Sequence, residues 1–122
     1  MPWDLKSDRP IYTQLIEQIE LKILSGEFPP GTRLPSVRDM AQEASVNPNT
    51  MQRALAKLEE DGLVVTHRTS GRTITEDADM IKQVKYQLAE KQIVEFIEKM
   101  QFMGFEKREI LTLITKMLEE MK

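Results

Sequence analysis

Residues 35–75 read PSVRDMAQEASVNPNTMQRALAKLEEDGLVVTHRTSGRTIT, and the pattern of this stretch decides the fold. Its first part predicts a short helix directly after Pro35. Ser36 is a good N-cap, because its hydroxyl can accept a backbone N–H group that has no partner within the helix. The residues behind it that share one helical face are all apolar: Val37, Met40, Ala41 and Ala44.

A second helix is predicted from Pro48, after the tight connection at residues 45–47. Asn47 caps its start, and proline suits the first helical position because its missing N–H group is not needed there. Gly62 marks the end of this helix. One face is apolar and is expected to be buried: Met51, Ala54, Leu55 and Leu58. The other face is largely polar: Asn49, Thr50, Gln52, Arg53, Ala56 and Lys57.

A small β-hairpin follows the second helix. Residues 63–66 and 73–75 have β character, and residues 68–72 between them have turn chemistry with two arginines, which predicts a hairpin with a basic tip. The order of helix, tight turn, helix and hairpin is typical of a winged helix-turn-helix.

Another helix precedes this stretch. Residues 2–10 are predicted to be extended, and Pro10 suits the first turn of the helix that follows. The apolar residues fall at helical spacing, and Gly26 ends the helix. Its predicted apolar residues are Ile11, Leu15, Ile16, Ile19, Ile23 and Leu24.

Two more helices are predicted beyond residue 76, at about 80–103 and 106–121, with Gly104 between them. The apolar residues of the first form two sets that are rotated relative to each other, so this helix either faces different partners along its length or kinks. The fold class is thus mainly α with a small β-hairpin. Residues 1–76 are predicted to form a winged helix-turn-helix domain with an N-terminal arm, and residues 77–122 a helical tail of two helices.

The tail is predicted to form a homodimer. A pair of short helices with wide apolar faces buries too little surface to be stable alone, so a second copy must cover them. The residues expected at this dimer interface are Leu88, Phe96, Ile97, Ile110, Ile114, Met117 and Leu118.

The composition excludes several functions. No apolar run approaches the roughly 18 residues that a membrane span needs, and the N-terminus does not resemble a secretory signal. There is no cysteine and only one histidine, His67, so neither a metal site nor a catalytic triad is expected. A glycine-rich phosphate loop is also lacking. We therefore expect a cytoplasmic protein that is not an enzyme and has no cofactor.

The distribution of charge is compatible with DNA binding. The net charge is -3, but residues 33–75 hold six basic and five acidic side chains, which gives a net charge of +1. What a phosphate backbone meets is the face presented to it, not the total charge. The charge is weak support alone, so the prediction depends on the pattern of side chains.

The side chains on the polar face of the second helix have the chemistry that reads DNA. Asn49, Gln52 and Arg53 can bond to base edges in the major groove. Asn47, Thr50 and the N–H groups at the helix start can bind phosphates. The rest of the predicted DNA-binding set lies on the preceding helix, the loop before it and the wing: Arg33, Ser36, Arg38, His67, Arg68, Gly71 and Arg72.

Residues 9–76 resemble the N-terminal domain of the GntR family of transcription regulators. The matching pieces are Pro30-Gly31, Leu34-Pro35-Ser36-Val37-Arg38, Asn49-Thr50, Ala54-Leu55, Leu58-Glu59 and Gly62-Leu63-Val64. The segment Val46–Thr50 and the short helical tail look most like the YtrA-like subfamily. The resemblance implies DNA contacts by Arg38, Asn47, Asn49, Thr50, Gln52, His67, Arg68, Gly71 and Arg72. Many relatives have basic residues in place of Pro48 and Gln52, so their base preference does not carry over.

These features predict a sequence-specific DNA-binding regulator. A symmetric dimer would present two recognition helices to a palindromic operator, with half-sites about 34–36 Å apart or near a multiple of that. The resemblance suggests a repressor and control of a transporter operon. A small-molecule effector is left open. The alternative is a winged-helix module that binds a protein, although the polar face lacks the aromatic or aliphatic anchors of such a surface.

Overall fold

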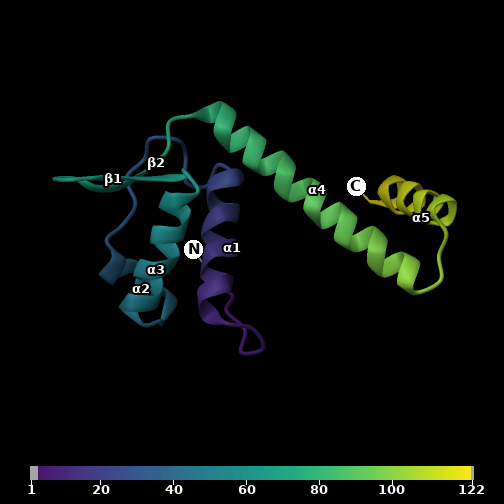
Figure 1. Cartoon of the computed structure of the whole chain (residues 1–122), viewed down its shortest axis with the longest axis horizontal. Helices are drawn as coiled ribbons and strands as arrows, with labels where there is room; N and C mark the ends of the chain where they lie inside the picture. The colour runs from purple at the N-terminus through teal and green to yellow at the C-terminus, as the bar shows by residue number, and fades with distance from the viewer. Residues whose placement is uncertain (1–2, 122) are drawn as a thin grey trace. The chain divides into compact units, whose positions relative to one another are not determined.

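The computed structural model describes residues 3–121, and it divides the chain into two compact units, one running to Val84 and the other starting at Lys85. The elements are α1 (Ile11–Leu24), α2 (Val37–Ala44), α3 (Pro48–Glu60), β1 (Val64–His67), β2 (Gly71–Ile74), α4 (Ala78–Phe102) and α5 (Lys107–Glu120) (Figure 1). The predicted fold class, mainly helical with one antiparallel hairpin, is confirmed.

The core of the first unit lies where α3 packs against α1 and α2. Leu15 and Ile19 of α1 are fully buried there, as are Leu55 and Leu58 of α3. Removing a Leu or Ile side chain from water stabilises the fold by about 1.5–3 kcal/mol. The apolar faces predicted from helical spacing are therefore the faces that form the core.

Both predicted helix caps are present. The Ser36 hydroxyl accepts the N–H of Asp39 at 3.1 Å, and the Asn47 side-chain oxygen accepts the N–H of Asn49 at 2.8 Å. Between the two helices the chain turns through Ser45, whose φ of 57° is left-handed. The two side-chain bonds fix where α2 and α3 begin, and the left-handed Ser45 ends α2.

The hairpin has a third segment beside it. β1 and β2 pair antiparallel, from Val64 opposite Ile74 to His67 opposite Gly71. Residues 31–34 run along the other edge of β2, where the N–H of Leu34 donates to the Arg72 carbonyl at 2.9 Å and the N–H of Ile74 donates to the Thr32 carbonyl at 2.8 Å. This segment leads into α2, so the wing is tied to the start of that helix.

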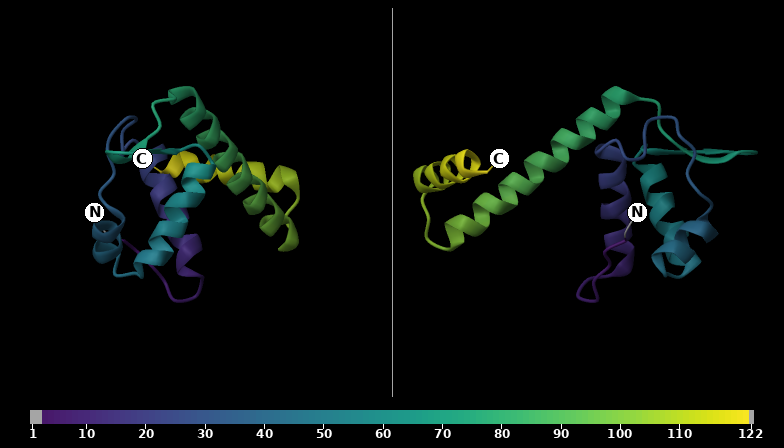
Figure 2. Two further views of the ribbon diagram at one scale, coloured as in Figure 1. Left: turned by 60° about the vertical axis from the view of Figure 1, so that its left-hand side comes forward. Right: turned by 180° about the vertical axis from the view of Figure 1, so that it is seen from behind.

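The first unit extends into α4. Met80, Ile81 and Val84 pack against the core of this unit, which is why it reaches Val84 and not only residue 76, the boundary expected from the sequence. α4 continues as one helix to Phe102 without interruption (Figures 1 and 2).

The second unit holds the remainder of α4 and α5. A capping box between Glu106 and Glu109 starts α5 after the turn at Gly104. Ile110 is the buried residue of α5, and most of the other large apolar side chains of this unit are exposed. No helix within residues 3–121 is long and apolar enough to cross a membrane.

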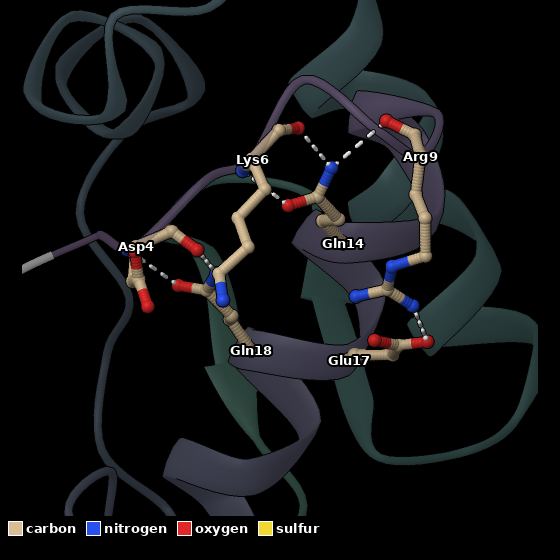
Figure 3. A network of polar contacts seen from close by, with 6 residues as sticks. All are labelled: Asp4, Lys6, Arg9, Gln14, Glu17 and Gln18. Atoms are coloured by element: carbon tan, nitrogen blue, oxygen red, sulfur yellow. Dashed lines mark hydrogen bonds and ion pairs between the residues drawn. The ribbon is translucent and has the colours of Figure 1, made fainter.

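The N-terminal arm is held on α1 by side-chain amides (Figure 3). Gln14 is buried, and its carboxamide accepts the N–H of Lys6 at 2.7 Å and donates to the carbonyls of Lys6 at 2.6 Å and Arg9 at 2.8 Å. Gln18 makes a similar pair of bonds to the backbone of Asp4, at 3.3 and 2.7 Å. These bonds fold the arm back onto the helix.

We expect Gln14→Ala to lower the free energy of unfolding by about 2–3 kcal/mol, because it removes three hydrogen bonds of about 1 kcal/mol each from a buried group. Gln18→Ala is the control, because the Gln18 amide is less buried. This variant should lose less than half as much free energy of unfolding as Gln14→Ala. Urea unfolding at one protein concentration measures the free energy of unfolding of both variants. Equal, small losses would mean that the arm adds no stability through Gln14.

Candidate DNA-binding surface

The outer face of α3 is open to solvent. Asn49, Gln52, Arg53 and Ala56 are exposed, whereas the opposite face of the helix is completely buried. Residues three or four positions apart lie on the same face of a helix, so burying the apolar face against the core leaves the polar face toward solvent. The helix thus presents amide and guanidinium groups away from the core.

The start of α3 differs from the expectation in one respect. Its backbone N–H groups were expected to bind phosphates, but they have partners within the chain. The N–H of Asn49 is taken by the Asn47 side chain, and those of Thr50 and Met51 donate to the Asn47 carbonyl at 3.0 and 3.1 Å. Pro48 has no N–H group. DNA contacts at this end therefore depend on side chains.

The start of α2 carries an exposed arginine. Arg38 lies in the first turn, beside Asp39, and its side chain is open to solvent. The Ser36 hydroxyl already accepts the helix N–H, which leaves its proton free to donate to an acceptor outside the chain.

The wing turn consists of Arg68, Thr69 and Ser70, all exposed. Gly71 and Arg72 were expected at the tip, but they lie in β2. Arg72 is half-buried, and within residues 3–121 its Nε has no hydrogen-bond partner. Arg68 is thus the arginine of the tip, and Arg72 belongs to its flank.

Two further residues border the wing. The ring nitrogen Nε2 of His67, which is exposed, lies 2.9 Å from the Thr73 hydroxyl. The Arg33 guanidinium lies beside Gly71, where an added Cβ would be 3.8 Å from two of its nitrogens. The segment that pairs with β2 therefore brings Arg33 to the wing. A hollow of about 670 Å³ lies here, lined by Arg33, Leu34, Pro35, Ser36, Val37, Asp39, Gly71 and Arg72.

The arginines of this surface form no ion pair within the part of the chain that the structure describes. The ion pairs of the described residues join Arg9 to Glu17, Lys22 to Glu27 and Lys57 to Asp61, and none involves an arginine between residues 33 and 72. The hydrogen bond and charge of Asp61 raise the pKa of Lys57, so this lysine stays protonated but paired. The arginines are the cations available to a phosphate.

Arg53 has an aromatic partner that the sequence did not reveal. Its guanidinium carbon lies 4.6 Å from the centre of the Tyr12 ring on α1. Helical spacing places each residue on its own helix but says nothing about which side chains of two helices meet. Tyr12 therefore had no signal in the sequence, although it borders the predicted surface.

All of these groups lie in the first compact unit, on α1, α2, α3, the wing and the segments that lead into α2 and α3. Hydrogen-bonding side chains on an exposed helix can bond to base edges, and flanking cations can bind the backbone. Among residues 3–121, no group of three or more His, Asp or Glu side chains could hold a metal ion.

Comparison with known proteins gives the family. Residues 11–74, more than half of the chain, match the family model described as bacterial regulatory proteins, gntR family. The chain belongs to the GntR family. Similarity to known proteins extends beyond the winged helix as well. The HTH-type transcriptional regulator YhcF of Bacillus subtilis is 39% identical over 106 residues, which cover 87% of this chain and 88% of YhcF.

Two other comparisons extend this finding. The HTH-type transcriptional repressor YtrA of Bacillus subtilis is 36% identical, over 84% of this chain and 80% of YtrA. A GntR family transcriptional regulator from Listeria monocytogenes has a solved structure with a TM-score of 0.86 and 36% identity, covering 92% of this chain and 98% of that one.

The resemblance inferred from the sequence is confirmed, including the YtrA-like subfamily. The chain is a DNA-binding transcription regulator of the GntR family and not an enzyme.

We expect Arg38→Ala and Arg68→Ala each to weaken DNA binding about tenfold, since a hydrogen bond to a charged group contributes about 1.5 kcal/mol or more. Each should also lower the slope of log affinity against log salt by about 1. Fluorescence anisotropy over a salt series measures both quantities. Arg108→Ala, which removes the same charge from an exposed position of α5, is the control. Unchanged affinity in both test variants would remove these residues from the surface.

Proposed function

We propose that the chain is a homodimeric transcription repressor that binds a palindromic operator with α3 in the major groove. The observation that carries this proposal is the exposed polar face of α3, beside arginines that no carboxylate of the described residues neutralises. A repressor of this kind works in the compartment that holds the DNA, which in a bacterium is the cytoplasm.

Side chains of α3 take the sequence-reading role in this proposal. Asn49 and Gln52 are exposed on the outer face, and their amides can pair with base edges. Thr50 is half-buried, and the side-chain oxygen of Asn47 already accepts the Asn49 N–H. We therefore assign both residues to phosphates at the edge of the groove and not to bases. The residues assigned to the DNA backbone are Arg33, Ser36, Arg38, His67, Arg68, Gly71 and Arg72.

The homodimer is supported by the apolar surface of the second unit. Phe96 of α4 is 44% exposed, and Met117 and Leu118 of α5 are 46% and 64% exposed. Leu111, which the sequence analysis did not assign to the interface, is 66% exposed. So much apolar surface on an isolated pair of helices needs a partner. A second copy of this chain carries the same apolar surface and can cover it in a two-fold symmetric dimer, which is the commonest form of protein oligomer.

Other residues of the predicted interface have different surroundings. Leu88, Ile97 and Ile114 are partly buried, which suits the edge of an interface. Ile110 is only 3% exposed, so we assign it to the interior of the protomer. A pocket for an effector would then lie between two copies.

Repression is supported by the name of YtrA, a transcriptional repressor that is 36% identical to this chain. Control of a transporter operon rests on the resemblance to the YtrA-like subfamily alone. A protein-binding role for α3 is less well supported, because none of the exposed large apolar side chains of the described residues lies on this helix.

Selection of bound sequences from a random DNA pool tests the proposal. We expect the chain to enrich an inverted repeat, because two α3 helices related by a two-fold axis read two half-sites. The double variant Leu111→Asp/Leu118→Asp should be monomeric by light scattering and should enrich at most a single half-site. Both side chains are exposed in the protomer, so the fold should survive.

Thr112→Asp/Thr115→Asp is the matched control, since it adds the same charge to exposed polar positions of the same helix. This variant should remain dimeric. A pool that enriches nothing would overturn DNA recognition, whereas an inverted repeat bound by a persistent dimer of the leucine variant would overturn only the assigned interface.

A further inference from the structure

The contact between Tyr12 and Arg53 joins α1 to the DNA-facing helix. The guanidinium of Arg53 lies 4.6 Å from the centre of the Tyr12 ring, within the distance of a cation–π interaction. Tyr12 lies in the first turn of α1 and is partly buried against the core, which holds its ring in place. Arg53 is exposed, so its charge remains accessible to a ligand.

The partners of the two basic residues of α3 differ. Lys57 lies 3.4 Å from the Asp61 carboxylate, one helical turn away. No carboxylate within the described part of the chain pairs with Arg53. The Tyr12 ring orients this guanidinium without cancelling its positive charge, which an acidic partner would do.

The position of the ring also indicates what Arg53 binds. A guanidinium that lies over a side chain of α1 is drawn off the outer face of α3 toward the neighbouring helix. In helix-turn-helix proteins base edges meet the residues at the start of the recognition helix, while flanking elements meet phosphates at the groove edge. Asn49 and Gln52 lie closer to that start.

We propose that Tyr12 is a positioning residue for DNA binding, which holds the Arg53 guanidinium at the groove edge so that it contacts a backbone phosphate and not a base. This role rests on the proposed function. Arginine has many rotamers, and a ring that restricts them reduces the entropy lost on binding. Saving part of the ordering cost of this one side chain then strengthens binding about two- to fivefold.

A double-mutant cycle tests the proposal, with affinities measured for the selected operator and for unrelated DNA of equal length. Arg53→Ala should weaken binding to both DNAs by the same factor and lower the salt slope by about 1. Tyr12→Leu should weaken binding two- to fivefold alone and have no further effect in the Arg53→Ala background. Tyr12→Phe keeps the aromatic ring, so this variant should bind DNA as tightly as the unchanged chain.

Several results would overturn the proposal. An equal loss from Tyr12→Leu in both backgrounds would mean that Tyr12 acts without Arg53, and no loss would mean that it does not act at all. A loss from Arg53→Ala confined to the operator would make Arg53 a base contact. Urea unfolding checks each variant, and Tyr12→Met, which fills similar space without a ring, replaces Tyr12→Leu if that variant does not fold. A wild-type chain that binds neither DNA would instead refute the proposed function.

Discussion

The packing of α3 against α1 and α2 is the interaction on which the rest of the structure depends. Met51, Ala54, Leu55 and Leu58 lose all exposure in this contact, and each larger side chain stabilises it by about 1.5–3 kcal/mol. Since these residues fix the rotation of α3 about its axis, they also determine which residues point outward. A rotation that exposed the apolar face would bury the amides of Asn49 and Gln52 instead.

The wing and α2 owe their arrangement to backbone hydrogen bonds. The segment at residues 31–34 pairs with β2 and continues into α2, so the arginines of the wing and of α2 are held by one connected piece of backbone. This explains how a chain with a net charge of -3 can bind a polyanion. In the proposed binding mode, binding depends on a local group of arginines that form no ion pair within residues 3–121, and the acidic side chains elsewhere affect it only through a screened field.

Local features of the fold were predictable from the sequence, and long-range features were not. Helical spacing, Ser36 and the Asn47-Pro48 pair act within one turn of backbone, so they located α2 and α3 correctly. The pairing of residues 31–34 with β2 and the contact of Tyr12 with Arg53 join residues about 40 apart, for which a single sequence gives no signal. The N–H groups at the start of α3 have local partners as well, because Asn47 offers them both its side-chain oxygen and its backbone carbonyl.

An NMR titration of the ¹⁵N-labelled chain with its selected operator shows whether α3 meets the DNA, because it reports which backbone amides are perturbed by the DNA. We expect the perturbed amides to cluster at the start of α2, along α3 from Asn49 to Arg53, and in the wing turn. Perturbations confined to α5, or spread evenly over the chain without a cluster on α3, would contradict it.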